Sequence, residues 1–302
     1  MKADYIWMNG KIVPFEEANI HFLSPTMHYG IGAFEGIRCY ETPEGAAVFR
    51  LREHIQRLLD SALILGVSEF PYSIDDLCQA TFETIKANGF KGCYIRPLIY
   101  LDGPLGLDLD ASVAKIGIAA WEWGTYLGDE ALERGVHMMV SSFTRHHINV
   151  SMTKAKISGN YVNSVLAKTL ALRSGYDEAI MLDPNGYVSE CSGENLFVVN
   201  DQDIETPPRA TILEGITRNS LVTIAKDSGY NITENLISRD QLYIADELFV
   251  CGTAAEVTPV RAVDHRTIGL GKPGPITKTI QQVFFDTVNG TGKRSKEWLE
   301  YV

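Results

Sequence analysis

A lysine lies in a polar, glycine-punctuated run at residues 156–161, and two glutamates, Glu190 and Glu194, lie in a second polar run at residues 189–197. A lysine amine that can lose its proton forms an imine with the aldehyde of a cofactor. A carboxylate elsewhere in the pocket can keep the ring nitrogen of that cofactor protonated. Together these residue types predict an enzyme that uses an aldehyde cofactor.

The residues around Lys156 help to decide whether it is a functional lysine or an ordinary surface residue. A lysine is most often a solvated surface charge, and a glutamate is most often merely exposed. Ser158 and Gly159 favour the functional interpretation, because small residues let a cofactor approach the backbone. A phosphate group would need donors, and Gly215-Ile216-Thr217 opens a predicted helix whose unpaired N–H groups suit an anion. Every helix has such an end, so this signal alone is weak.

Four separated motifs carry a resemblance to a known family. They occupy residues 29–40, 156–197, 214–218 and 252–260. In order and spacing they resemble the branched-chain aminotransferases of pyridoxal phosphate fold type IV, and the similarity runs over nearly the whole chain. The resemblance implies a mixed α/β (α+β) fold of two domains. We expect a smaller N-terminal domain at 1–121, an interdomain loop at 122–131 and a larger, pyridoxal phosphate-binding domain at 132–302.

The resemblance also assigns roles around the cofactor, pyridoxal 5'-phosphate. Lys156 matches the position that binds it covalently and then acts as general base, whereas Lys154 falls two residues short and is interpreted as structural or surface-facing. Glu190 would face the ring nitrogen, and Glu194 would support the local turn. The other expected cofactor-binding residues are Tyr161 at the phenolic oxygen, and Arg57, Ile216, Thr217 and Thr253 at the phosphate.

The expected substrate pocket combines aromatic residues for an aliphatic side chain with donors for carboxylates. Its members are Tyr29, Phe34, Tyr94, Arg96, Trp123, Tyr126, Ala254 and Ala255. By resemblance, Arg96 would help to bind the second carboxylate of glutamate or 2-oxoglutarate. The expected reaction is a two-step, ping-pong amino-group transfer between leucine, isoleucine or valine and 2-oxoglutarate, through the pyridoxamine form of the cofactor.

Other functions of the same fold stay open at this point. They are a D-amino acid or (R)-amine transaminase, a lyase, or, less favoured, a noncatalytic cofactor-binding protein. Residues 103–111 lack the asparagine-proline stretch typical of many bacterial members, which leaves the substrate range open. The family resemblance further predicts an obligate homodimer, or a higher homo-oligomer, in which Tyr29 and residues 103–111 reach into the partner's pocket.

The composition of the chain bears on its binding partners and its location in the cell. The chain has 302 residues, 45% hydrophobic and 22% charged, with a net charge of −11 that opposes binding to nucleic acid or anionic membranes. Five scattered cysteines contain no C-x-x-C pair, so we expect reduced, mostly buried thiols and neither disulfides nor a metal site. With neither a signal-peptide pattern nor a membrane-length apolar run, the expected location is the cytoplasm.

Local patterns predict the elements that position these residues. Asn9-Gly10 predicts a hairpin between residues 5–8 and 11–14. Apolar residues at helical spacing predict a helix from Leu51, and Ser73 with Asp76 predicts a capped helix ending at Asn88-Gly89. Strands are expected at 94–101, 115–121, 136–142, 178–182 and 196–199, and helices at 160–174, 217–228 and 276–288.

Overall fold

The computed structural model describes residues 3–124 and 126–302 and confirms the mixed two-domain fold. Its contacts divide the chain into two compact units. The first contains the chain up to Trp123 together with Ala155–Asn160 and Thr287–Val302, and the second contains Gly124–Lys154 and Tyr161–Asp286. The chain enters the second unit inside the expected interdomain loop. Two segments within the expected C-terminal domain belong to the first unit, and one of them carries Lys156.

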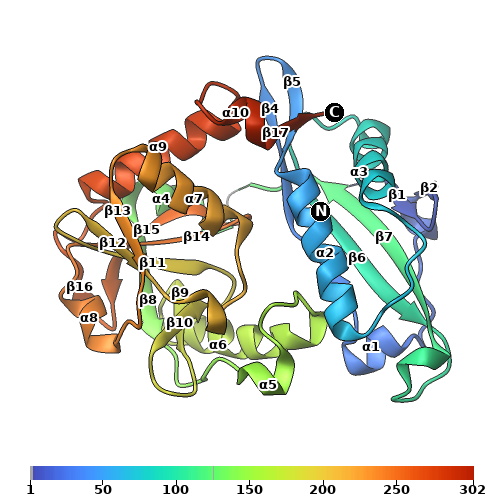
Figure 1. Cartoon of the computed structure of the whole chain (residues 1–302), viewed down its shortest axis with the longest axis horizontal. Coiled ribbons are helices and arrows are strands. Elements are labelled where there is room, and N and C mark those ends of the chain that lie inside the picture. The colour runs from blue at the N-terminus through green and yellow to red at the C-terminus, as the bar shows by residue number, and fades with distance from the viewer. Residues whose placement is uncertain (1–2, 125) are drawn as a thin grey trace. The chain divides into compact units, whose positions relative to one another are not determined.

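The first unit is built on an antiparallel sheet in the order β17-β5-β4-β6-β7-β1-β2, with β3 paired to β6 (Figure 1). The strands are β1 (Tyr5–Met8), β2 (Lys11–Pro14), β3 (Ala33–Phe34), β4 (Ile37–Thr42), β5 (Gly45–Phe49), β6 (Cys93–Asp102), β7 (Val113–Trp121) and β17 (Leu299–Tyr301). Helices α2 (Leu51–Leu65) and α3 (Ile74–Asn88) bury their apolar faces in one core with these strands. Short helices α1 (Pro25–Tyr29) and α10 (Ser295–Trp298) complete the unit.

Local sequence signals explain several of these elements. Asn9 and Gly10 both adopt positive φ, at 50° and 97°, as the predicted hairpin turn requires. The Ser73 hydroxyl accepts from Asp76 N, and the Asp76 carboxylate accepts from Ser73 N, so the predicted capping box begins α3. Helix α2 begins at Leu51, as predicted, and its buried residues include Ile55 and Leu58 on the apolar face.

The second unit is built on a mixed sheet in the order β10-β9-β8-β15-β14-β11-β12-β13, with β16 paired to β15 (Figure 1). The strands are β8 (Val136–Val140), β9 (Glu178–Leu182), β10 (Val188–Cys191), β11 (Asn195–Asn200), β12 (Asp203–Thr206), β13 (Asn231–Glu234), β14 (Glu247–Gly252), β15 (Glu256–Val263) and β16 (Arg266–Thr267). The helices are α4 (Asp129–Arg134), α5 (Ile148–Ser151), α6 (Tyr161–Arg173), α7 (Ile216–Asp227), α8 (Arg239–Tyr243) and most of α9 (Pro275–Val288). Helix α6 packs Ala167 and Ala171 against Ala179 and Met181.

The predicted elements agree with the structure to within a few residues at their ends. The largest differences are of two residues: β7 begins at Val113 rather than at residue 115, and β8 ends at Val140 rather than at residue 142. All five cysteines are free and buried, which confirms the predicted burial of the thiols. In the described part of the chain, no helix is long and apolar enough to cross a membrane, and no cluster of three metal-ligating side chains occurs.

Candidate active site

Lys156 is held in the first unit through its main chain. Its N–H donates to Ser61 Oγ at 3.0 Å, and its carbonyl accepts from Phe34 N at 3.0 Å. The amine Nζ lies 4.9 Å from the centre of the Phe34 ring. Gly159 lies so close to Gly30 that a Cβ on Gly30 would be 2.8 Å from Gly159 Cα. The glycines noted in the sequence therefore let two backbones meet, and this contact fixes the segment that carries the lysine.

Arg57 is fixed by a buried ion pair that sequence reasoning missed. Its Nε and Nη2 donate to Glu35 Oε1 and Oε2 at 2.6 and 2.9 Å, and His54 Nδ1 lies 2.8 Å from Oε2. Burial alone would raise the pKa of Glu35, but the Arg57 guanidinium and then His54 outweigh it and hold that pKa well below its usual range. Arg57 and His54 lie three residues apart on α2, so they share one helix face. That spacing was the available signal.

Replacing Glu35 with alanine should lower the free energy of unfolding by about 3–5 kcal/mol near neutral pH, because it removes the carboxylate that pairs with a largely buried guanidinium. The ionised carboxylate is the stabilising form, so its contribution is present above the unfolded-state pKa of about 4.3 and declines as the pH falls below it. Denaturant titrations at several pH values measure both effects. Glu53→Ala removes an exposed partner of Arg50 on the same helix and should cost less than about 1 kcal/mol. Equal losses in the two variants would contradict this account.

Four of the expected pocket residues of the first unit form one cluster. The Arg96 guanidinium carbon lies 4.7 Å from the Phe34 ring centre, and Arg96 Nη2 lies 3.0 Å from the Tyr94 hydroxyl. The Tyr94 ring packs edge-on against Trp123 at 4.7 Å. Gly36 is required here, since a Cβ on it would be 2.1 Å from the Tyr94 hydroxyl oxygen. Tyr29 instead lies on α1 with its side chain exposed, and its ring neighbours His28.

Glu190 lies on β10 of the second unit, where its carboxylate is buried but well supplied with donors. Arg145 Nε donates to Oε1 at 2.7 Å, and Asn195 Nδ2 and Leu213 N donate to Oε2 at 3.3 and 3.2 Å. A carboxylate has about four lone-pair positions, so this one can accept a further donor beside these three. Sequence reasoning named neither Arg145 nor Asn195. Asn195 lies in the polar run at residues 189–197, whereas no sequence pattern indicates a role for Arg145.

The expected phosphate residues of the second unit lie at two turns. Helix α7 begins at Ile216 after Gly215, and Thr217 is buried in its first turn. A Cβ on Gly215 would be 2.1 Å from Asn195 Oδ1. Glycine therefore lets this helix start beside Asn195, which donates to Glu190. Thr253, Ala254 and Ala255 form the hairpin turn between β14 and β15, and Glu256 after it adopts a left-handed φ of 53°. Ala255 is buried, while Thr253 and Ala254 are half-buried.

The remaining expected residues are placed individually. Tyr161 is half-buried at the start of α6, and Tyr126 lies on the loop before α4, with Lys168 Nζ 5.1 Å from its ring centre. Lys154 bonds to the Glu214 carboxylate and to the carbonyl of Arg209, in an exposed ion pair. Glu194 accepts from Gly193 N at 3.1 Å, as expected of a residue that supports the turn.

Glu194 should make stability depend on pH. Burial and then the neighbouring Glu178 raise the pKa of Glu194 to about 8. The folded state therefore keeps a proton that the unfolded chain releases near about pH 4.3. As the pH rises from about 4.3 to about 8, the free energy of unfolding should decrease, by at most about 1.4 kcal/mol per pH unit. Glu194→Gln keeps a neutral donor and should flatten this dependence, whereas the exposed Glu297→Gln should not. Unfolding curves across this pH range would refute the assignment if all three proteins showed the same slope.

Comparison with known proteins places this geometry in a family. The model of the amino-transferase class IV family matches residues 32–263. A branched-chain-amino-acid aminotransferase of Pseudomonas aeruginosa is 49% identical over 299 residues, covering 98% of this chain and 97% of that protein. The crystal structure of the Escherichia coli branched-chain amino acid aminotransferase superposes with a TM-score of 0.97 at 48% identity, covering 99% of each chain. The chain therefore belongs to the class IV aminotransferases, and within them to the branched-chain-amino-acid aminotransferases.

A third relative was solved with a cofactor derivative. The T.th. branched-chain amino acid aminotransferase complexed with N-(5'-phosphopyridoxyl)-L-glutamate has a TM-score of 0.95 and 46% identity, covering 100% of this chain and 99% of that one. The donor set here fits pyridoxal 5'-phosphate. It offers an amine at Lys156, a buried carboxylate with acceptor capacity at Glu190, and a helix start with a hydroxyl at Thr217.

Proposed function

We propose that this protein transfers the amino group between a branched-chain L-amino acid and 2-oxoglutarate with pyridoxal 5'-phosphate as cofactor. The observation that carries the proposal is the similarity to branched-chain aminotransferases over 98% of the chain. The donor set described above supports it. When bound, the cofactor supplies an aldehyde for the substrate amine and a ring that withdraws electrons from the α-carbon.

Each residue then has a task that its environment supports. Lys156 anchors the cofactor and moves the proton at the substrate α-carbon, with its backbone pinned by Ser61 and Phe34. Glu190, held by Arg145, keeps the ring nitrogen protonated. Arg57, the first turn of α7 at Ile216 and Thr217, and Thr253 would hold the phosphate, and the Tyr161 hydroxyl would bond to the phenolic oxygen.

Substrate recognition requires both an apolar surface and a cation. Phe34, Tyr94 and Trp123 would supply aromatic surface for the aliphatic side chain. By the same resemblance, Tyr126, Ala254 and Ala255 are further pocket residues. Arg96, already in contact with Phe34 and Tyr94, supplies the positive charge for the second carboxylate of glutamate. The glutamate derivative bound by the third relative supports this assignment.

A panel of amino donors tests the proposed function. The cofactor-loaded protein should convert L-leucine, L-isoleucine and L-valine with 2-oxoglutarate, and the cofactor absorbance should shift on mixing with L-leucine alone. A preference for D-amino acids or chiral amines would overturn the proposal in favour of another activity of the same fold. An unchanged absorbance would indicate a noncatalytic binder.

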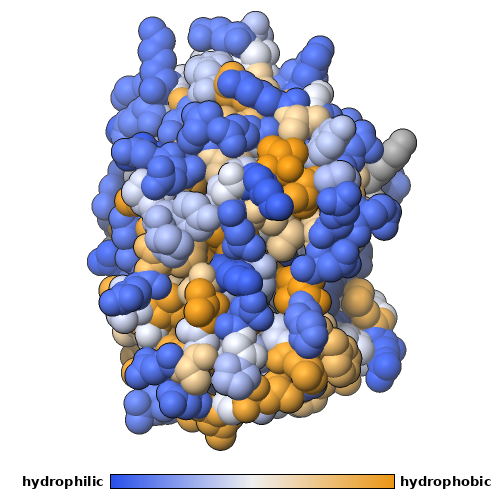
Figure 2. All heavy atoms as spheres, turned by 90° about the vertical axis from the view of Figure 1, so that its right-hand side faces the viewer, coloured by the Kyte–Doolittle hydropathy of each residue, from blue (hydrophilic) through white to orange (hydrophobic). Residues whose placement is uncertain are grey.

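The homodimer is part of the same proposal, and exposed apolar residues support it. Figure 2 shows hydrophobic residues gathered at the lower end of one face, the end at which Figure 1 labels α1. In and just before α1, Phe22, Leu23 and Met27 are exposed, and the loop at 103–111 exposes Leu105 and Leu107. Helix α6 buries Ala167 and Ala171 yet exposes Val162, Val165 and Leu172, so it is apolar on more than one face. Exposed apolar surface of this kind is typical of subunit interfaces.

Disrupting this surface should remove assembly and activity together. Leu107 is 91% exposed in the single chain, so Leu107→Glu should leave the subunit folded but prevent a partner from covering the loop. Light scattering and leucine turnover measure the two effects, and dilution of the wild type should reproduce them. Leu270→Glu, at a position 84% exposed in the second unit, is the matched control and should change neither. A monomeric variant with full activity would refute a pocket shared between subunits.

We also propose that the protein acts in the cytoplasm. Its five free, buried cysteines suit a reducing compartment.

A further inference from the structure

Lys168 is a largely buried cation that the proposed mechanism does not use. It lies on α6, and its side chain is only 18% exposed. The ammonium donates to Glu178 Oε2 at 2.6 Å and to the carbonyl of Asp177 at 2.7 Å. It also lies 5.1 Å from the centre of the Tyr126 ring, within the range of an attractive cation–π contact. Two acceptors and one aromatic ring therefore surround a single ammonium group.

A buried acid pair holds this ammonium in place. Glu178 is fully buried on β9, and its Oε1 accepts from Ala179 N at 2.7 Å. Glu194 is hydrogen-bonded to Glu178, and burial followed by that carboxylate raises the pKa of Glu194 to about 8, so Glu194 keeps its proton at neutral pH. Glu178 is the carboxylate that pairs with Lys168. A charge so enclosed cannot move without leaving a buried carboxylate unpaired.

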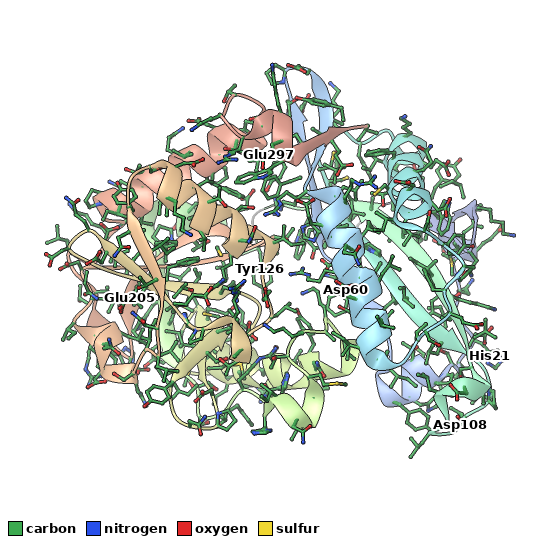
Figure 3. The ribbon with its side chains drawn as sticks, in the orientation of Figure 1. His21, Asp60, Asp108, Tyr126, Glu205 and Glu297 are labelled. Atoms are coloured by element: carbon green, nitrogen blue, oxygen red, sulfur yellow. The ribbon has the colours of Figure 1, made fainter. Side chains whose placement is uncertain are left out.

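The partner of the ammonium lies on an irregular segment. Tyr126, labelled in Figure 3, belongs to the loop that joins β7 to α4, outside any helix or strand. Outside helices and strands, side-chain contacts contribute to the position that a loop residue adopts. The contact with Lys168 connects this loop to α6, to β9 and, through Glu194, to the turn at Gly193.

We propose that Lys168 is a positioning residue for substrate binding, because its anchored ammonium holds the Tyr126 ring in the place where that ring contacts the substrate side chain. This inference rests on the proposed function, since the pocket role of Tyr126 is part of it. Lys168 itself touches neither substrate nor cofactor. It acts by keeping one wall of the pocket ordered before the substrate arrives.

Replacement of Lys168 by methionine tests this role. The variant keeps an unbranched side chain of similar length but removes the charge. KM for L-leucine should therefore rise about threefold to tenfold, with kcat changed less than about twofold. Lys168→Arg restores a cation and should restore KM. Arg173→Met removes an exposed charge from the same helix and should leave both constants unchanged. In a Tyr126→Leu background, Lys168→Met should raise KM no further.

Amide hydrogen exchange of residues 122–130 supplies a readout that does not depend on turnover. Exchange of this loop should be roughly twofold to thirtyfold faster in Lys168→Met than in the wild type, and unchanged in Lys168→Arg and Arg173→Met. A purely structural role of Lys168 would lower global stability without this local change. Identical loop exchange and KM in Lys168→Met and Arg173→Met would overturn the proposal.

The test also covers an inactive wild type and a Lys168→Met variant that does not fold. If the wild type does not convert leucine, the proposed function fails, and loop exchange alone decides whether Lys168 positions Tyr126. If Lys168→Met does not fold, Tyr126→Phe and Tyr126→Leu replace it. Phenylalanine keeps the ring face and should protect the loop as tyrosine does, whereas leucine should not. Equal exchange in those two variants would refute the contact as the positioning interaction.

Discussion

Replacement of Lys156 by alanine is expected to reduce leucine turnover by at least about 10⁴-fold, because it removes both the covalent anchor of the cofactor and the base that moves the α-proton. The fold should survive. The contacts of Lys156 with Ser61 and Phe34 use its main-chain N–H and carbonyl, which alanine keeps. Steady-state turnover, together with the unfolding midpoint of the variant, measures both expectations.

Lys154 provides the control for this prediction. Its ammonium is already bonded to Glu214 and to the carbonyl of Arg209, so Lys154→Ala should retain most of the turnover. Borohydride reduction of the cofactor-loaded protein should attach the label at residue 156. A label on Lys154, or full activity of Lys156→Ala, would show that the wrong lysine has been assigned.

Glu190→Gln is expected to lower kcat by about 10²–10³-fold, because a neutral amide cannot hold the ring nitrogen in its protonated form. The structure adds a second reason. Three donors, from Arg145, Asn195 and Leu213, point at this side chain, and the NH₂ of glutamine would oppose one of them. We therefore also expect a measurable loss of stability, detected as a lower unfolding midpoint.

Glu194→Gln tests which of the two glutamates in the run at residues 189–197 faces the ring nitrogen. Glu194 is protonated at neutral pH, so the amide replaces a neutral donor with another and should preserve most of the turnover. Cofactor titration and stopped-flow absorbance would show whether Glu190→Gln still binds the cofactor while the proton transfer slows. A normal kcat in Glu190→Gln combined with a low kcat in Glu194→Gln would reverse the assignment.

Local sequence determined the elements that carry the site. The Asn9-Gly10 turn, the capping box at Ser73 and the helix start after Gly215 each depend on residues within one turn of one another. Their conformations follow from φ preferences and from backbone donors that need a partner, so they can be predicted without any distant contact. The motif spacing likewise placed Lys156 and Glu190 in the chain, and Glu35 within the first motif, but gave no partner for any of them.

Only the tertiary structure decided which side chains meet. Arg145 reaches Glu190 across 45 positions of sequence, and Arg57 reaches Glu35 across 22. It also decided that Ala155–Asn160 belongs to the first unit, where Ala33 pairs with Ile157. An arginine that pairs with a buried carboxylate has the same local sequence as one that is solvated. What separates them is the burial of both partners, and burial is a property of the packed sheets and helices rather than of any local pattern.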